Sequence, residues 1–326
     1  MIPRKRPAWQ AGEWRSILAR AVRDVDELWR LLALPPALLP GARAAARRFP
    51  LRLPRPYLQR MRRGDPDDPL LRQFLPLGEE LEEVAGFVTD PVGDEAALAA
   101  PGVLRKYHGR VLLITTGACP VHCRYCFRRH FPYEKQRLQV PVVGSEVEEV
   151  ILSGGDPLSL SDARLAELVS SLPSRVTLRL HSRMPVVLPQ RIDTGFLAWV
   201  EREVGRGRRL VMVIHANHAR EVDGTVEMAL EALRLRGVML LNQAVLLRGV
   251  NDEAEVLAAL SRRLFQAGVL PYYLHRLDPV AGAAHFQVED ERAGELMEAL
   301  RTELPGYLVP RLVRESAGAP YKLPLS

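Results

Sequence analysis

The spacing of apolar residues predicts a helical region at the start of the chain. In segment 13–34, apolar residues recur every three or four positions, which predicts one amphipathic helix. Prolines at positions 35, 36 and 40 should end it, and a second helix is expected near 40–48. Proline-bearing acidic loops follow around 64–70 and 90–102. We therefore expect an N-terminal helical region over residues 1–100.

From residue 110 the pattern changes to short apolar runs that alternate with amphipathic stretches. The runs predict strands at 110–116, 148–153, 176–181, 209–215, 238–246 and 270–276. The stretches predict helices near 161–172, 192–204, 222–236, 252–267 and 288–303. Six such units are typical of an α/β fold with a parallel sheet, and they are too few for an eight-fold barrel.

A partial (β/α)6 barrel over residues 101–305 fits this pattern best, with active-site residues at the carboxyl ends of its strands. A Rossmann sheet is the alternative, but no G-x-G-x-x-G follows the first strand. Residues 306–326 then form a separate C-terminal segment.

Composition excludes several classes of protein. The 326 residues are 47% hydrophobic and 26% charged, as in ordinary globular proteins, so one large or two small domains are expected. No run of about 18 apolar residues suggests a membrane span. The basic N-terminus lacks the apolar run of a secretory signal, and three cysteines make no disulfide framework, so we expect a cytoplasmic protein without membrane contact.

The net charge of +6 comes almost entirely from arginine. Only four of the 45 basic residues are lysines, and the arginines lie along the whole chain. This distribution indicates a compositional bias more than a nucleic-acid-binding patch. Chemistry that requires a primary amine therefore has few candidates: Lys5, Lys106, Lys135 and Lys322.

All three cysteines lie in one window after the first predicted strand, with the spacing C-x3-C-x2-C: Cys119, Cys123 and Cys126. Three thiolates on a tight loop can bind three irons of a [4Fe–4S] cluster and leave the fourth iron open. Structural zinc is the alternative, with His122 or His130 as a fourth ligand, but no second pair of ligands is present.

This spacing, after the first strand of a partial barrel, resembles the signature of radical S-adenosylmethionine (SAM) enzymes. The resemblance implies that the open iron binds SAM. Ser153, Gly154, Gly155 and Asp156 after the second strand look like the glycine motif that receives the methionine amino group. Glycines allow the backbone to approach a ligand closely, although a plain strand-to-helix turn is the other interpretation.

Further motifs narrow the resemblance to the lysine 2,3-aminomutase family. They are RMRRGDPDDPLLRQFLP (60–76), CRYCFRRHF (123–131), LSGGDPL (152–158), HSRMPVVLPQRI (181–192) and LNQAVLLRGVND (241–252). The similarity extends from about residue 55 to 324. It implies conversion of L-α-lysine to β-lysine. The compact length resembles the subgroup that supplies (R)-β-lysine for elongation factor P, which implies a functional link to that factor and its β-lysine ligase.

The resemblance also implies pyridoxal 5′-phosphate (PLP), held as an imine on a lysine near the C-terminus. Lys322 aligns with that lysine, and an imine requires a primary amine. Lys106, Tyr107 and Arg110 match positions that contact PLP in the family. Residues 306–326 are thus expected to form the PLP-lysine segment.

The remaining site residues are carried over by the same alignment. Arg128 matches the arginine that pairs with the substrate carboxylate, and Asp278 and Glu315 match the acids that bind the distal ammonium of lysine. The strand-end residues His181, Arg183, His215 and Gln243 are expected to line the SAM site. His275, His285 and His218 are interpreted as structural.

Two other functions remain open from the sequence. An aminomutase acting on glutamate or arginine would keep the cluster and Lys322, and a glutamate enzyme should place a cation at the far end of its pocket. A zinc-bearing nucleic-acid-binding protein is the more distant alternative. The favoured interpretation implies a reductant such as flavodoxin or ferredoxin, no nucleic-acid partner and a possible homo-oligomer.

Overall fold

The computed structural model describes residues 9–136, 138 and 143–325, and its strands form one sheet whose spatial order follows the chain. Strands β3 to β9 pair in parallel, whereas β1, β2 and β10 pair antiparallel at the two edges. The strands are β1 (Leu98–Ala100), β2 (Val103–Leu104), β3 (Arg110–Thr116), β4 (Glu149–Gly154), β5 (Thr177–Ser182), β6 (Leu210–Ile214), β7 (Met239–Val245), β8 (Leu270–His275), β9 (Arg311–Arg314) and β10 (Leu323–Pro324).

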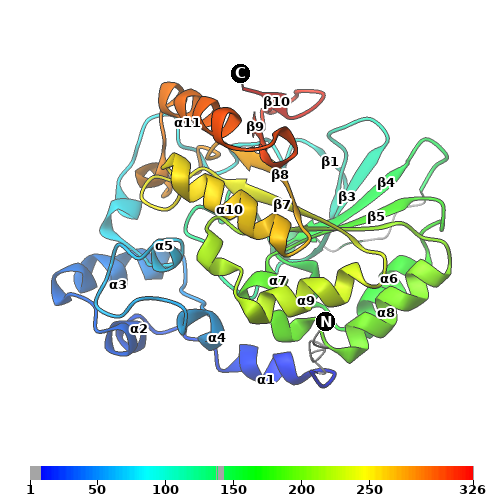
Figure 1. The fold of residues 1–326 in the computed structure, drawn as a ribbon, viewed down its shortest axis with the longest axis horizontal. Coiled ribbons are helices and arrows are strands. Elements are labelled where there is room, and N and C mark those ends of the chain that lie inside the picture. Colours follow the sequence, from blue (N-terminus) through cyan, green and yellow to red (C-terminus); the bar gives the residue numbers. More distant parts are fainter. Residues whose placement is uncertain (1–8, 137, 139–142, 326) are drawn as a thin grey trace.

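Strands β3 to β8 are the six predicted strands, displaced by two residues or fewer at their ends. Their connecting helices lie along the outer side of the curved sheet (Figure 1). These helices are α6 (Asp162–Ser170), α7 (Met184–Val187), α8 (Thr194–Gly205), α9 (Gly224–Arg234), α10 (Ala254–Gln266) and α11 (Asp290–Glu303). Of these, the four-residue α7 was not predicted. Among the described strands, β1 and β10 stay at opposite ends of the order, so the sheet is a partial barrel.

The prediction of one helix over 13–34 is wrong. Two helices occupy this segment, α1 (Glu13–Ala19) and α2 (Val25–Leu32). The chain between them is extended because Val22 exchanges both backbone hydrogen bonds with Leu53, each 2.9 Å long. Asp24 then caps α2 by accepting a hydrogen bond from the Glu27 amide.

The predicted helix near 40–48 is present as α3 (Leu39–Arg48), and two short helices follow, α4 (Arg55–Leu58) and α5 (Pro69–Arg72). One hydrophobic core extends from Trp14 in α1 to Leu312 in β9. The N-terminal helices therefore pack on the barrel as part of one continuous interior.

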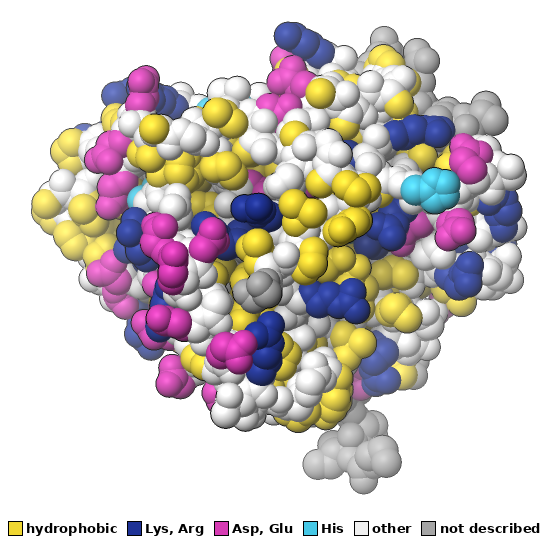
Figure 2. All heavy atoms as spheres, turned by 90° about the horizontal axis from the view of Figure 1, so that it is seen from above, with side chains coloured by type: hydrophobic (Ala, Val, Ile, Leu, Met, Phe, Trp, Pro, Cys, Tyr) yellow, Lys and Arg dark blue, Asp and Glu magenta, His cyan; other side chains and the backbone are white. Residues whose placement is uncertain are grey.

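On the face seen in Figure 2, acidic and basic side chains alternate and no broad basic patch stands out. Many of the arginines pair with nearby acids, as Arg164 does with Glu167 and Arg292 with Glu253. Within the described part of the chain, no helix is both long and apolar enough to span a membrane.

Candidate active site

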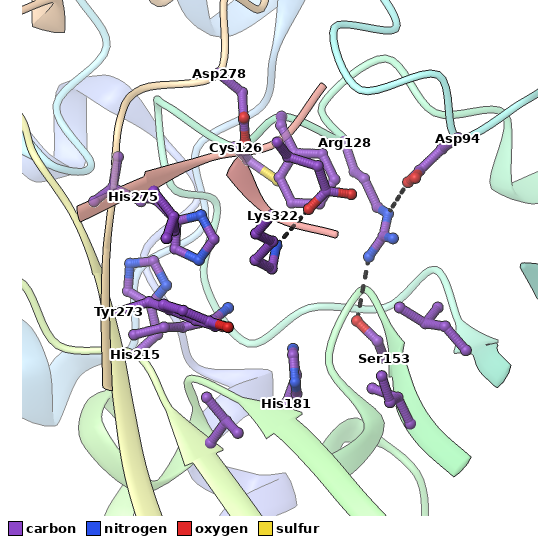
Figure 3. A pocket seen from close by; sticks show the side chains of 18 of the residues that line it. Asp94, Cys126, Arg128, Ser153, His181, His215, Tyr273, His275, Asp278 and Lys322 are labelled. Carbon is purple, nitrogen blue, oxygen red and sulfur yellow. Dashed lines mark hydrogen bonds and ion pairs between the residues drawn. The ribbon is translucent and has the colours of Figure 1, made fainter. Parts of the chain in front are cut away.

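A cavity of about 520 Å³ opens at the carboxyl ends of the parallel strands and continues down into the barrel. Its walls come from the ends of β3, β4, β5 and β6 and the loops after them, from β8 and β9, and from the C-terminal segment (Figure 3). The structure brings every predicted site residue to this one cavity: Lys106, Tyr107, Arg110, Cys119, Cys123, Cys126, Arg128, Ser153, Gly154, Gly155, Asp156, His181, Arg183, His215, Gln243, Asp278, Glu315 and Lys322.

A chain of alternating charges crosses the cavity. The Arg128 Nε donates to Asp94 Oδ2 at 2.6 Å, and Lys106 Nζ lies 2.5 Å from Asp94 Oδ1. Lys106 also donates to Glu315 Oε1 at 2.8 Å, and the other oxygen of Glu315 binds Lys322. Although burial opposes it, Lys322 and Lys106 together hold the pKa of Glu315 well below its usual value. Glu315 is therefore a carboxylate shared by two lysines.

Asp278 stands apart from this chain of ion pairs. Burial, reinforced by the negative charge of Glu315, raises the pKa of Asp278 to about 7, against the opposing effect of Lys322 and Lys106. Within the described residues, no group forms a hydrogen bond or an ion pair with its carboxyl group. Asp278 is thus an acid at the cavity wall that a cation from outside could pair with.

The three cysteines lie on the loop after β3, which its neighbours hold in place. Backbone amides of His122 and Arg124 donate to the carbonyls of Arg52 and Gln73, at 3.1 and 2.9 Å. Burial raises the pKa of Cys119 well above its usual value and that of Cys126 to about 11. Bound metal would be needed to keep these thiols deprotonated at neutral pH.

The glycines at the end of β4 pack directly against the cysteine loop. Gly154 has a φ of +116°, and a Cβ atom there would lie 2.6 Å from the carbonyl oxygen of Thr116. A Cβ atom on Gly155 would lie 2.4 Å from the carbonyl oxygen of Ala118. Because backbone oxygens cannot move aside cheaply, glycine is required at both positions for the two loops to meet.

Asp156 holds the ends of β4 and β5 together. Its carboxylate accepts hydrogen bonds from the Ser182 hydroxyl and from the amides of Leu158, Arg183 and Met184. Burial raises its pKa to about 6, although these hydrogen bonds oppose the rise. The side chain therefore faces the protein, and it fixes the loop that carries Arg183.

Two histidines at the strand ends are neutral. Burial lowers the pKa of both His181 and His215 well below the usual value. The Nε2 of His215 lies 3.0 Å from the Tyr125 hydroxyl, whereas the buried Nε2 of His181 has no hydrogen-bond partner among the described residues. His181 thus offers a polar atom that a ligand in the cavity could satisfy.

Comparison with known proteins gives close, nearly full-length relatives. The chain is 47% identical to an L-lysine 2,3-aminomutase of Escherichia coli strain K12, over 96% of this chain and 94% of that protein. It is 42% identical to an L-lysine 2,3-aminomutase of Haemophilus influenzae, covering 99% and 98%. An L-lysine 2,3-aminomutase of Clostridium subterminale is 32% identical, covering 96% and 78%. No family model matches the chain.

The chain belongs to the L-lysine 2,3-aminomutase family. This places it among isomerases, and membership implies the radical SAM cluster, with which the C-x3-C-x2-C motif is consistent. The resemblance inferred from the motifs is confirmed.

The cysteine loop fits a cluster better than a single metal ion. Among the described residues, no three His, Cys, Asp or Glu side chains converge on a point where one ion could be held. A [4Fe–4S] cluster does not need such convergence, because each thiolate binds a different iron. The three thiols line the same cavity, so one cluster can meet all of them.

The lower cavity fits the family's second expected cofactor, PLP. Lys322 supplies the required amine, and Arg110, Arg179 and Arg311 line the same cavity, where a phosphate would find cationic partners. Arg110 and Arg179 also pair with Glu149. Lys106, expected beside PLP, lines this cavity and pairs with Asp94 and Glu315. Arg110 lies over the ring of Tyr107, at 6.0 Å from its centroid.

Several residues of the cavity were not predicted from the sequence. Asp94 is the most important, because its buried carboxylate joins Arg128 to Lys106. Its partners lie 34 and 12 positions away, so no local pattern indicated the pairing. Tyr273 and His275 on β8 also face the cavity, and His275 was interpreted as structural. Their alternate spacing on one strand was a signal that could have found them.

Proposed function

We propose that this chain converts L-α-lysine to β-lysine by radical chemistry, with a [4Fe–4S] cluster, SAM and PLP as cofactors. The observation that carries the proposal is that three clustered thiols, a lysine amine and the acid Asp278 line one cavity, in a chain 47% identical to a lysine 2,3-aminomutase. The reaction moves the amino group from Cα to Cβ and a hydrogen atom the other way, so it needs no net oxidant or reductant.

The positions of the residues indicate which of them would bind each cofactor. Cys119, Cys123 and Cys126 would bind the cluster, and Lys322 would hold PLP. When bound, the cluster and SAM supply a radical that takes hydrogen from the substrate, and PLP supplies a ring that delocalises the unpaired electron. The protein orients the substrate and excludes water.

Arg128 is suited to orient the substrate carboxylate. Asp94 holds its Nε, and the Ser153 hydroxyl accepts from Nη1 at 3.2 Å, so the guanidinium is fixed before the substrate arrives. Among the described residues, none forms a hydrogen bond with its Nη2, which can therefore form a charge-assisted hydrogen bond with a carboxylate. At the other end, Asp278 would pair with the distal ammonium, with Glu315 as the second acid nearby.

The finer assignments rest on the subgroup resemblance. We propose the (R) form of the product, a functional link to elongation factor P and its β-lysine ligase, and flavodoxin or ferredoxin as the reductant that starts the reaction. We also propose that Ser153, the two glycines, His181, His215 and Gln243 face SAM.

The test is an anaerobic assay of the reconstituted protein with L-lysine, SAM, PLP and dithionite. Formation of β-lysine, resolved by chiral chromatography, is the expected result. Parallel assays with glutamate and arginine decide between the aminomutases. Glutamate is not complementary to Asp278, whereas arginine is cationic like lysine and is separated from it only by comparing the two turnover rates. Turnover of glutamate but not of lysine would contradict the proposal.

A further inference from the structure

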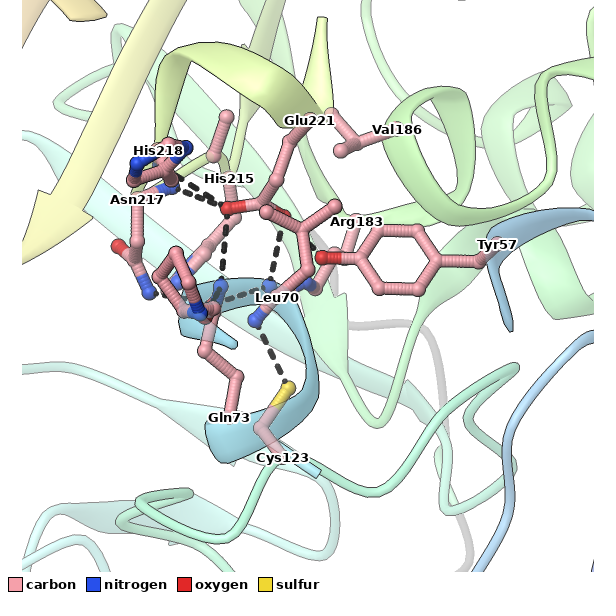
Figure 4. Close-up of polar contacts among 12 residues, drawn as sticks. Tyr57, Leu70, Gln73, Cys123, Arg183, Val186, His215, Asn217, His218 and Glu221 are labelled. Atoms are coloured by element: carbon pink, nitrogen blue, oxygen red, sulfur yellow. Dashed lines mark hydrogen bonds and ion pairs between the residues drawn. The ribbon is translucent and has the colours of Figure 1, made fainter. Parts of the chain in front are cut away.

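The guanidinium of Arg183 points at a cysteine of the cluster loop. Its Nη1 donates to Cys123 Sγ at 3.1 Å, and the residue is only 6% exposed (Figure 4). Among the described residues, Arg183 is the side chain for which the structure gives a hydrogen bond to a cysteine sulfur. The sequence predicted Arg183 as a SAM ligand, yet its donors are directed to Cys123 and to the protein behind the cavity.

Three elements fix the guanidinium in this position. Its Nη2 donates to Gln73 Oε1 at 2.6 Å and to Glu221 Oε2 at 2.9 Å, and Nη1 also contacts the Tyr125 hydroxyl. The ring of Phe74 lies against the guanidinium, 4.7 Å from Cζ to the ring centroid. The arginine therefore cannot turn towards the cavity without breaking a buried ion pair.

Glu221, the counter-ion, is itself held from several sides. It accepts hydrogen bonds from the Tyr57 hydroxyl at 2.9 Å, from the Asn217 amide at 2.7 Å and from Gln73 Nε2 at 3.2 Å. Tyr57 and Gln73 come from the N-terminal region, and Glu221 from the loop after β6. These contacts fix the carboxylate that pairs with Arg183 Nη2, and thereby the direction in which Nη1 donates to Cys123.

We propose that Arg183 is a positioning residue that raises the reduction potential of the cluster. Donors and positive charge near the sulfurs set the potential of iron–sulfur clusters. Reduction adds one negative charge, so a fixed guanidinium stabilises the reduced form more than the oxidised form. The inference rests on the proposed function, since it needs a cluster on Cys123.

The other arginines around the loop are directed elsewhere. Arg124 and Arg129 both pair with Glu80, and Arg128 pairs with Asp94. The structure therefore separates the cations that neutralise acids near the loop from the one that donates to a ligand sulfur. Electron transfer into a cluster of low potential would be the step that benefits from Arg183.

The test is a redox titration of the anaerobically reconstituted full chain, without SAM or lysine, monitored by the electron paramagnetic resonance of the reduced cluster. Arg183→Lys keeps a positive charge beside Glu221 but lacks the second guanidinium nitrogen, which donates to Cys123. We expect its equilibrium constant for one-electron reduction to fall about tenfold, which is a shift of about 59 mV to lower potential.

A double variant, Arg183→Gln with Glu221→Gln, removes both charges of the pair. Its net charge equals that of the parent, so a fall in potential cannot be ascribed to a change in net charge. The matched control is Arg191→Lys. Arg191 is also buried, lies between the rings of Trp14 and Phe196 and pairs with Asp162, but it has no contact with a cysteine.

The outcomes are distinct. Lower potentials in both Arg183 variants and an unchanged potential in the Arg191 control support the proposal. Parent-like potentials in Arg183→Lys and in the double variant overturn the proposal and leave the proposed function intact. A shift of the same size in the Arg191→Lys control has the same consequence. A reconstituted parent without iron and sulfide overturns the proposed function and this inference together.

Discussion

The ammonium of Lys106 lies 2.8 Å from one carboxylate oxygen of Glu315, and Lys322 binds the other oxygen. Lys106 precedes β3 and Glu315 follows β9, so the ion pair joins the two ends of an open sheet. The same two sides meet at Gly93, where a Cβ atom would lie 2.9 Å from Ala317 Cβ. Because both lysines engage Glu315, Asp278 is the better placed acid for a substrate ammonium.

Replacing Asp278 should impair the use of lysine. An ammonium that enters the cavity loses water, and an unpaired buried charge costs several kcal/mol. We expect Asp278→Ala to lower kcat/KM for lysine by on the order of 10²-fold, equivalent to ~2.7 kcal/mol. Steady-state assays of β-lysine formation check this expectation.

Asp278→Asn separates charge from shape, and it should be nearly as damaged as the alanine variant. Cleavage of SAM without lysine turnover should persist in both, because the cysteines are untouched. Parent rates in both variants would show that Asp278 does not meet the substrate.

The KM for lysine should depend on pH through Asp278. Its pKa is raised to about 7 by burial and by Glu315, so below that pH the carboxyl group is mostly protonated and neutral. The substrate ammonium favours the carboxylate, so binding at lower pH must release this proton. We expect KM to rise as pH falls below 7, approaching about tenfold per pH unit.

Initial-rate measurements across this range check the dependence, with Asp278→Asn as the control. The amide of that variant does not titrate, so its KM should be high and nearly flat. A parent KM that stays constant from about pH 5 to pH 8 would argue against ionisation of Asp278 on binding.

Asp94→Asn should destabilise the chain before any cofactor is bound. The Asp94 carboxylate pairs with Arg128 and Lys106, and its side chain is 2% exposed. Removing one partner of a buried ion pair costs about 3–5 kcal/mol, because the remaining charges stay buried. Denaturant unfolding of the cofactor-free protein measures the loss. The neighbouring exposed Glu95 gives the control Glu95→Gln, which should unfold like the parent.

Borohydride should attach PLP to the peptide that contains Lys322. The Lys322→Ala variant should lose this label but still bind iron, because the cysteines lie on a different loop. Lys135→Ala is the control, since Lys135 is exposed and does not line the cavity. Peptide mass spectrometry locates the label, and its recovery on Lys106 would contradict the assignment.

Each cysteine should be required for the cluster. The chain has no cysteine besides Cys119, Cys123 and Cys126, so no other thiol can replace a lost ligand. Alanine at any of the three should abolish reductive cleavage of SAM and lower the iron content below about four per chain. Iron and sulfide analysis after anaerobic reconstitution checks this, and stoichiometric zinc in place of iron would contradict the assignment of a cluster to these cysteines.

The barrel was predictable because each of its main strands and helices has a recognisable pattern within its own short segment of sequence. Strands β3 to β8 have five to seven residues each and are separated by helical repeats, which a periodicity search detects. Strands β9 and β10 have four and two residues, too few to show a period. The break between α1 and α2 depends on Leu53, some thirty positions from Val22, which no local pattern contains.

In the site, too, features within one short segment were predictable and contacts between distant segments were not. The cysteine spacing and Lys322 are readable in short segments, whereas the Asp94 pairings join residues on different loops. Arg183 was expected to line the SAM site from its position at a strand end, but its hydrogen bond to Cys123 depends on Gln73 and Glu221, which fix the direction of its side chain.

Tyr57 and Gln73 give the N-terminal region a share in the cofactor site, since both bind the carboxylate that holds Arg183. In a barrel fragment without this region, the face of the Arg183 guanidinium that Phe74 covers would be exposed to water. Glu221 would also lose the hydrogen bonds from Tyr57 and Gln73. An engineered barrel that is shortened or transferred to another protein should therefore retain residues 57–74 together with the cysteine loop.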